Sequence, residues 1–128
     1  MKLKNKIVLV TGAGSGIGEA VAHLFAQEGA RLSLVDKSSD TVESTWKDLT
    51  DGGHEALRFC ADITHADKVI ELVNQTMEQW GRIDVLVNNA GGPCANDLLD
   101  MDDEQWDRDI ELNLTATARL TKAVLPHM

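Results

Sequence analysis

The 128-residue sequence contains no tyrosine, and its last serine is Ser44. Tyrosine is one of the side chains that most often transfer protons in catalysis, so proton transfer through that residue is excluded within this chain. The only cysteines, Cys60 and Cys94, are far apart in a chain with no recognisable export signal, which indicates reduced thiols rather than a disulfide framework. None of the four histidines shows the spacing of a zinc site, so we expect no metal; they are His23, His54, His65 and His127.

Positive charge and long apolar runs are also scarce. Twelve Lys and Arg residues against 21 Asp and Glu residues give a net charge of −9, which repels nucleic acid and anionic lipid. The longest aliphatic run near the start, Ile7 to Val10, is too short to cross a bilayer and lacks the length of a secretory signal. We therefore expect one cytosolic domain over residues 1–128 that binds neither nucleic acid nor membrane.

Four short apolar runs alternate with longer segments of helical periodicity. The runs occupy residues 7–10, 32–35, 56–61 and 83–87. This alternation is typical of parallel strands joined by crossover helices. The sequence therefore predicts the α/β fold class.

Two helices are predicted in the first half of the chain. Apolar residues recur at helical spacing from Ile17 to Phe25, and Gly29 follows at the position where a helix ends. A second, weaker pattern over residues 39–49 is closed by Gly52 and Gly53. These two helices would connect the first three strands.

Two further helices are predicted in the second half. One begins at Thr64, whose hydroxyl we expect to cap the amide of Asp67, and it ends at Gly81. The other runs from Asp103 towards Pro126. Residues 97–111 hold eight acidic side chains and one basic side chain. A solvated helix start is the simpler interpretation of this cluster, and an acidic docking surface is the alternative.

A glycine-rich segment, Thr-Gly-Ala-Gly-Ser-Gly-Ile-Gly at positions 11–18, joins the first strand to the first helix. Glycines allow a ligand to approach the backbone closely, and the free amides of a helix start attract a pyrophosphate. A P-loop is excluded, because Glu19 stands where that motif requires lysine. The segment predicts a dinucleotide phosphate site, and a glycine turn without a ligand is the alternative.

Asp36 ends the second predicted strand, 18 positions after Gly18. An acid near this spacing accepts hydrogen bonds from the ribose hydroxyls of adenosine and repels a ribose 2′-phosphate. This favours NAD over NADP, although Lys37 would soften the discrimination. The alternative is that Asp36 only begins a turn.

Two amides and two glycines follow the fourth strand, in residues 88–92. The carboxyl ends of parallel strands are where an open α/β sheet forms its ligand crevice, so contact with a ligand is expected. Asparagine side chains also tie strand ends together, and the two roles can coexist. Asn113 lies within the last predicted helix, which helix propensity disfavours, so it either faces solvent or serves a polar site.

These motifs together resemble the short-chain dehydrogenase/reductase family. Residues 11–18 match its Thr-Gly-x-x-x-Gly-Ile-Gly pattern, and Asn88-Asn89-Ala90-Gly91 is similar to its second motif. Asp62-Ile63 resembles its adenine contact, and Asn113 its helix asparagine. The resemblance covers essentially the whole chain.

The resemblance implies a Rossmann-like, doubly wound parallel sheet that stops after the fourth strand and the following helix. It assigns Asn113 a catalytic role, in which the asparagine supports a water that links a catalytic lysine to solvent. The helical region from Asp103 resembles the segment that commonly joins subunits, which implies a homo-oligomer. The implied cofactor contacts are Gly12, Ser15, Gly16, Ile17, Gly18, Asp36, Asp62, Ile63, Asn89, Ala90 and Gly91.

The residues that the family uses for proton transfer are missing from this chain. The family has a serine and a Tyr-x-x-x-Lys pair after the Asn113 helix, whereas Lys122, the only lysine after Asn113, lies on that helix itself and not in such a pair. We therefore expect the cofactor-binding half of an NAD-dependent oxidoreductase for an alcohol or carbonyl, inactive alone, with the fourth strand left as an edge. The alternatives are a free-standing NAD-binding or interaction module without catalysis, and a partly folded relic.

Overall fold

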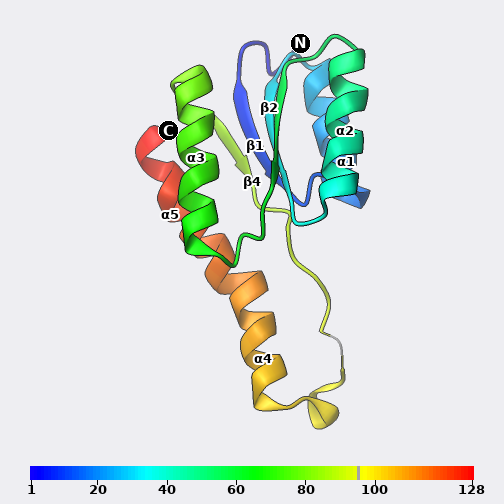
Figure 1. Cartoon of the computed structure of the whole chain (residues 1–128), viewed down its shortest axis with the longest axis vertical. Coiled ribbons are helices and arrows are strands. Elements are labelled where there is room, and N and C mark those ends of the chain that lie inside the picture. The colour runs from blue at the N-terminus through cyan, green and yellow to red at the C-terminus, as the bar shows by residue number, and fades with distance from the viewer. Residues whose placement is uncertain (95) are drawn as a thin grey trace.

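The computed structural model describes residues 1–94 and 96–128 and contains one parallel sheet within them (Figure 1). The strand order is β3-β2-β1-β4, and all three pairings are parallel. This order confirms the predicted α/β class. The strands are β1 (Ile7–Thr11), β2 (Arg31–Asp36), β3 (Ala56–Cys60) and β4 (Val85–Val87).

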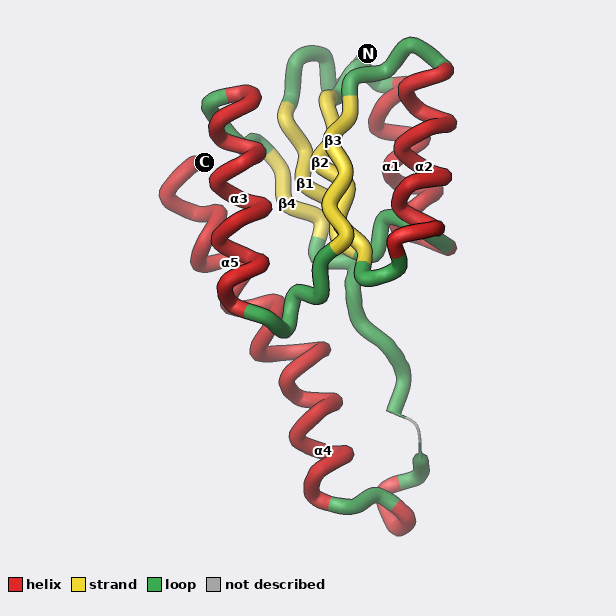
Figure 2. Tube along the Cα trace, viewed as in Figure 1, coloured by secondary structure: helices red, strands yellow, loops and turns green. Residues whose placement is uncertain are grey.

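Helices cover both faces of the sheet, as Figure 2 shows: α1 and α2 lie on one side, and α3 and α5 on the other. This is the doubly wound, Rossmann-like arrangement that the family resemblance implied. The helices are α1 (Gly16–Gln27), α2 (Ser39–Asp51), α3 (Ala66–Trp80), α4 (Asp103–Ile110) and α5 (Ala116–Val124). A π-helical turn, Glu111–Thr115, connects α4 to α5, and 3-10 turns lie at Leu98–Asp100 and Leu125–His127.

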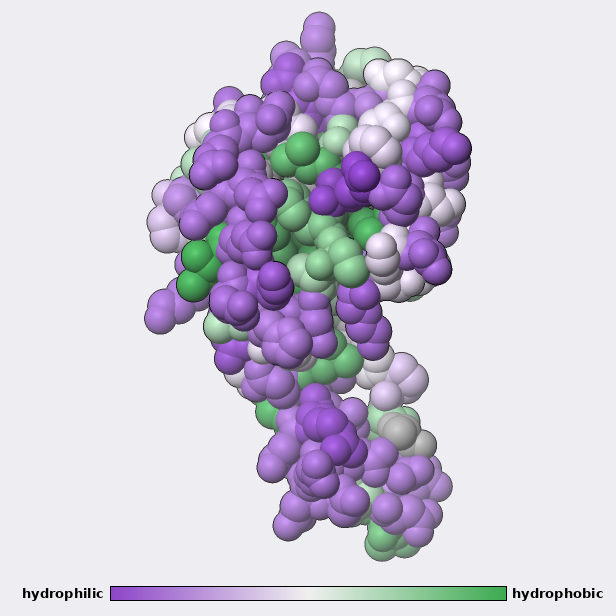
Figure 3. All heavy atoms as spheres, viewed as in Figure 1, coloured by the Kyte–Doolittle hydropathy of each residue, from purple (hydrophilic) through white to green (hydrophobic). Residues whose placement is uncertain are grey.

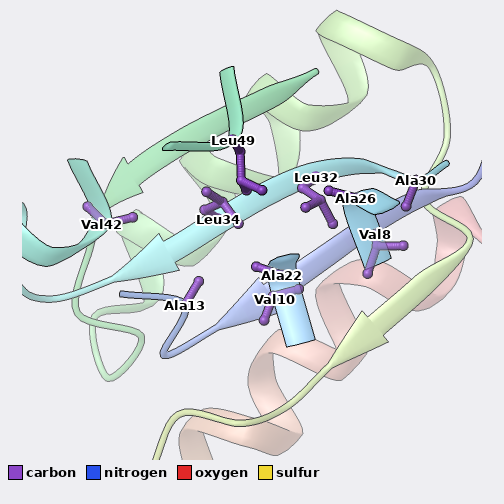
Figure 4. Close-up of a cluster of buried hydrophobic side chains, with 10 residues drawn as sticks. All are labelled: Val8, Val10, Ala13, Ala22, Ala26, Ala30, Leu32, Leu34, Val42 and Leu49. Atoms are coloured by element: carbon purple, nitrogen blue, oxygen red, sulfur yellow. The ribbon is translucent and has the colours of Figure 1, made fainter. Parts of the chain in front are cut away.

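The core divides into two layers because successive strand residues point to opposite faces. Val8 and Val10 of β1 pack in the layer under α1 and α2, whereas Leu9 between them packs in the other layer. Complete burial of one such side chain stabilises the fold by about 1.5–3 kcal/mol. Figure 4 draws the first layer: Val8, Val10, Ala13, Ala22, Ala26, Ala30, Leu32, Leu34, Val42 and Leu49.

The second layer joins α3 and α5 to the sheet. Leu72 of α3 and Leu120 of α5 are both buried in it. One polar pair also crosses this layer, since the hydroxyls of Ser33 and Thr76 lie 2.7 Å apart and share a hydrogen bond. The buried serine of β2 therefore has a partner, which removes most of the cost of burying its hydroxyl.

The predicted ends of two helices are confirmed by their glycines. Gly29 after α1 and Gly81 after α3 have φ angles of +88° and +76°, the left-handed conformation in which glycine ends helices. Helix α2 runs two residues beyond the predicted end at residue 49. The sequence pattern therefore located these helices well.

The predicted cap at Thr64 is wrong. Helix α3 begins at Ala66 with His65 in the cap position, and the Thr64 hydroxyl donates a hydrogen bond of 2.7 Å to the Asp62 carboxylate instead. The Thr64 amide donates to the same oxygen at 3.0 Å. Asp62 thus forms a turn with Thr64, and this turn takes the hydroxyl that the sequence assigned to the helix.

The predicted single helix from Asp103 to Pro126 is interrupted. A π-helical turn at Glu111–Thr115 separates α4 from α5, and Asn113 lies inside it. The sequence offered only the unfavourable helix propensity of that asparagine as a signal. Such π turns occur frequently at functional sites.

Helix α4 projects away from the sheet, as Figure 1 shows. All eight of its residues are described, and none of them is buried. Figure 3 shows that this part of the molecule is mostly hydrophilic, which agrees with the acidic composition of residues 97–111. None of the described helices is long and apolar enough to cross a membrane.

Candidate functional site

A cleft of about 230 Å³ opens at the carboxyl ends of the strands. Eight of the eleven predicted cofactor contacts line it, and four further residues complete the wall. The glycine turn, the end of β2, the turn after β3 and the segment after β4 therefore meet at one place. The lining residues are Gly12, Ser15, Val35, Asp36, Lys37, Ala61, Asp62, Ile63, Asn89, Ala90, Gly91 and Leu112.

Four predicted site residues stand outside the cleft lining: Gly16, Ile17, Gly18 and Asn113. Gly18 has a packing role, because a Cβ atom there would overlap the carbonyl of Gly12. Ile17 is 76% exposed at the start of α1. The glycine motif thus serves both the packing of β1 against α1 and the shape of the cleft.

Two glycines of the turn adopt backbone conformations that other residues rarely adopt. Gly12 has φ +63°, and a Cβ atom on it would lie 2.7 Å from Nδ2 of Asn89. Gly16 has φ +56°, and apart from its chain neighbours and the backbone of its own helix no atom of the described chain lies within 4 Å of the position of its Cβ. The backbone at Gly16 is therefore open to close approach by a ligand.

The start of α1 is suited to an anion. Ser15 occupies the cap position, and its side chain makes no cap hydrogen bond within the part of the chain that the structure describes. The first amides of a helix have no intrahelical acceptor, and they carry the positive end of the helix dipole. Because Ser15 also lines the cleft, a pyrophosphate would fit at this helix start.

Asp36 lies on the cleft wall with its carboxylate held by two backbone amides. Gly14 donates to one oxygen at 2.9 Å, and Ser38 donates to the other at 3.0 Å. A carboxylate oxygen can accept two hydrogen bonds, and each oxygen of Asp36 accepts one here, so each can accept one more. The bond from Ser38 shows that Asp36 begins a turn, as the alternative interpretation held. This turn does not use all the acceptor positions of the carboxylate, so a contact with ribose is compatible with it. Lys37 lines the cleft beside Asp36.

Asp62 and Ile63 form the wall after β3. Burial by itself would raise the pKa of Asp62, but hydrogen bonds from Thr64 and the charges of His65 and Lys37 lower the pKa below 3.8. The carboxylate is therefore ionised at neutral pH. Ile63 is 4% exposed and offers an apolar surface beside it.

Thr11 organises the segment after β4, and the sequence argument did not select it. Its buried hydroxyl accepts hydrogen bonds from the amides of Asn89 (3.1 Å) and Ala90 (2.9 Å). It also donates to the carbonyl of Val87 at 3.3 Å. The position of Thr11 in the glycine motif was the available signal, but its partners lie more than 70 residues away along the chain.

Asn89 ties the segment after β4 to the end of β1. Its Nδ2 donates to the carbonyls of Thr11 (3.1 Å) and Gly12 (3.3 Å). Its neighbour Asn88 reaches α5 instead, where it donates to the hydroxyl of Thr121 at 3.0 Å. These side-chain amides therefore tie neighbouring segments together, as one of the two interpretations held. Asn89 also lines the cleft.

Asn113 holds the segment after β4 against the π turn. Its Oδ1 accepts a hydrogen bond of 3.0 Å from the amide of Gly92, and its Nδ2 donates to the carbonyl of Asp109 at 3.0 Å. Gly91 must stay small, because a Cβ atom there would lie 2.7 Å from Oδ1 of Asn113. Asn113 is exposed and at the same time bonded to the segment after β4, so both features considered from its sequence position are present.

The described residues contain no group of three or more His, Cys, Asp or Glu side chains that could hold a metal ion. Cys60 and Cys94 are both free, as expected for reduced thiols, and both are exposed.

A doubly wound parallel sheet with a glycine-rich first turn and a cleft at the strand ends defines the Rossmann-like class. Within this class, the chain belongs to the short-chain dehydrogenase family, whose profile matches residues 6–128. This confirms the resemblance drawn from the sequence motifs.

Curated relatives are similar along the whole chain. The 3-oxoacyl-(acyl-carrier-protein) reductase FabG of Thermotoga maritima is 39% identical over 128 residues, which cover 100% of this chain and 52% of that protein. Oxidoreductase UcpA of Salmonella typhimurium is 42% identical over 127 residues, 99% of this chain and 48% of that protein. The chain therefore spans about half the length of the curated relatives it matches.

Solved structures also match nearly the whole of this chain and about half of their own length. A 7α-hydroxysteroid dehydrogenase in complex with NADH and 7-oxo glycochenodeoxycholic acid has a TM-score of 0.94 and 32% identity, over 99% of this chain and 49% of that chain. A variant of actinorhodin polyketide ketoreductase with NADPH has a TM-score of 0.90 and 37% identity, over 94% and 46%. Both nicotinamide dinucleotides thus occur among the similar structures.

Proposed function

We propose that this chain binds NAD in the cleft at the carboxyl ends of its strands, as the cofactor-binding half of an oxidoreductase. The observation that carries this proposal is the cleft itself, which gathers the glycine turn, Asp36, and residues 62–63 and 89–91. Such a cleft at the strand ends is where this fold class binds dinucleotides.

Each part of the cleft has a role in this proposal. The start of α1 at Ser15 and Gly16 takes the pyrophosphate, and Asp36 takes the adenosine ribose. By the family resemblance, the wall at Asp62 and Ile63 contacts adenine, and Asn89 to Gly91 lie along the nicotinamide half. The open space at the Cβ position of Gly16, next to the cleft-lining Ser15, supports the pyrophosphate assignment.

We propose NAD rather than NADP as the cofactor because of Asp36. Its carboxylate already binds two amides, and the residue lines the cleft, where a carboxylate disfavours a ribose 2′-phosphate. The similar structures include both an NADH and an NADPH complex, so the preference rests on this residue.

The bound nicotinamide would exchange a hydride with an alcohol or carbonyl substrate in the whole enzyme. Asn113 would serve there by fixing the segment after β4, through its hydrogen bond to Gly92. The chain contains no tyrosine, so we propose that these 128 residues bind the cofactor and do not catalyse alone. The second candidate is a module that binds NAD without any catalysis.

We also propose that the chain associates with a second copy of itself along the helical region from Asp103 onward. Trp106, Ile110 and Leu114 are spaced by four residues, which places them on one side of this region. They are 50%, 38% and 62% exposed, so apolar area is available for burial against a partner.

A titration of the 128-residue chain with NADH and NADPH, followed by nicotinamide fluorescence, tests the cofactor proposal. We expect NADH to bind more tightly, and Asp36→Asn to weaken NADH binding about tenfold, since hydrogen bonds to charged groups contribute about 1.5–3 kcal/mol. The same variant should reduce the ratio of the affinity for NADH to the affinity for NADPH. The matched control, Asp40→Asn, changes an exposed acid in the first turn of α2 and should leave both affinities unchanged.

Circular dichroism separates a failure of binding from a failure of folding. A folded chain that binds neither dinucleotide would refute the proposal. A chain that binds NADPH at least as tightly as NADH would refute the role of Asp36 and leave the dinucleotide site in place.

A further inference from the structure

Arg119 of α5 joins two walls of the cleft that are far apart in the sequence. Its Nη1 atom donates one hydrogen bond of 3.0 Å to the carbonyl of Thr64 and another of 3.0 Å to Oε1 of Glu111. A guanidinium Nη atom carries two hydrogens, so both donors of this atom are used. The sequence argument gave this arginine no role.

The first of these bonds holds the wall that follows β3. Thr64 donates its amide and its hydroxyl to the Asp62 carboxylate, at 3.0 Å and 2.7 Å. Asp62 and Ile63 line the cleft. Arg119 therefore binds the opposite end of the same turn that presents these two residues to the ligand.

The second bond holds the wall formed by the π turn. Glu111 is the first residue of that turn, Leu112 lines the cleft, and Asn113 accepts the amide of Gly92. A shift of Glu111 would therefore move both Leu112 and the segment after β4. The ion pair to Arg119 fixes the start of this turn.

Arg119 itself stands on a rigid base. Ala116 and Leu120, on the same helix, are completely buried in the core layer shared with α3. The Arg119 side chain is 34% exposed, so solvent screens its electrostatic attraction to Glu111 only in part. The guanidinium that joins the two walls is thus anchored in the core through its own helix.

We propose that Arg119 is a positioning residue that sets the separation of the two cleft walls and thereby the affinity for the dinucleotide. This inference rests on the proposed function. Each wall contacts a different part of the ligand, and a dinucleotide gains from both only when their spacing is already correct. Loss of the guanidinium would relax both walls together.

The test compares Arg119→Met, which keeps most of the side-chain stem, with Arg119→Lys, which restores a charged donor. We expect Arg119→Met to weaken NADH binding about tenfold, and Arg119→Lys to recover part of that loss, because lysine lacks the planar fork of arginine. The matched control is Arg31→Met, which removes a similarly exposed arginine that pairs with Glu55 at 3.2 Å, at the opposite end of β2.

Amide hydrogen exchange without ligand provides a readout that does not depend on NADH. The amides of Thr64 and Gly92 report on the two walls, since each donates to a side chain within its own wall. Both should exchange faster in Arg119→Met than in the wild type, and Arg31→Met should change neither. Urea unfolding of every variant shows whether the fold as a whole is retained.

The two readouts distinguish the inference from the function on which it rests. If wild-type chain does not bind NADH while both amides respond to Arg119→Met, the proposed function fails and the role of Arg119 in wall geometry stands. Unchanged exchange at both amides overturns the inference, whatever the affinity for NADH. Faster exchange with unchanged NADH affinity overturns the link between wall spacing and binding.

Discussion

Thr11 shows how much of the site depends on a single buried hydroxyl. It accepts the amides of Asn89 and Ala90 and donates to the carbonyl of Val87. These three bonds fix the segment after β4 at the point where it enters the cleft. A threonine at the end of a strand therefore determines the position of residues that contact the ligand in our proposal.

Thr11→Val should destabilise the chain by about 2–4 kcal/mol, because two half-buried amides lose their acceptor. Valine has nearly the same shape, so the loss reports the hydroxyl rather than packing. Thr11→Ser keeps the hydroxyl and should cost about 1 kcal/mol for the lost methyl group. Urea unfolding measures both variants, and equal losses in the two would show that the hydroxyl has no such role.

At this scale the sequence predicted which residues meet, and it missed several of the bonds between them. Eight predicted contacts line one cleft, since the motif residues follow directly on strands whose ends share an edge of the sheet. The partners of Thr11 and Arg119 were missed because their positions depend on strand order and helix packing. The Thr64 hydroxyl was assigned to the helix because propensity cannot show that Asp62 competes for it.

Among the elements, β4 depends on the charged residue just before it. Asp84 accepts the Ile7 amide at 2.8 Å and two hydrogen bonds from Arg82, and Lys6 lies 3.7 Å away. Burial alone would raise the pKa of Asp84, but the bonds from Arg82 and Ile7 and the charges of Arg82 and Lys6 lower the pKa below 3.8. The carboxylate thus holds the starts of β1 and β4 together in its ionised form.

Asp84→Asn should lower the free energy of unfolding at neutral pH by about 1–2 kcal/mol, since it removes the charge and one acceptor. A lowered pKa in the folded state means that this stabilisation is complete above about pH 4 and is lost as the pH falls through the folded pKa. The difference between wild type and variant should therefore shrink below pH 3.8. Urea unfolding at neutral and acidic pH checks this, with the exposed Asp51→Asn as the control; a difference that stays constant with pH would contradict it.

The elements that the sequence predicted best are those whose pattern is local. Strands and the first three helices follow from apolar spacing and from glycines that end helices. The break between α4 and α5 did not follow, because a π turn depends on how Asn113 bonds to the neighbouring segment. No residue of α4 is buried, so nothing in the described chain holds this helix to the sheet by apolar packing.

For the molecule as a whole, two features leave interaction surfaces uncovered. Within the described residues β4 pairs with β1 alone, so it forms an edge of the sheet, as the sequence predicted. The residues of β4 are half-buried rather than fully exposed. The apolar side chains of Trp106, Ile110 and Leu114 lie on the helical region that projects from the sheet. An edge strand and an exposed apolar surface both favour association.

We expect the chain to form oligomers at high concentration, and Leu114→Glu to shift it toward monomer, because the substitution places a charge in a surface that would become buried. The control is Leu24→Glu, which changes a leucine of α1 with 55% exposure, close to the 62% of Leu114. Sedimentation velocity at increasing protein concentration measures the result. Added salt should strengthen association, since the net charge of −9 makes two copies repel each other. Equal effects of the two substitutions would show that the contact does not depend on the apolar surface around Leu114.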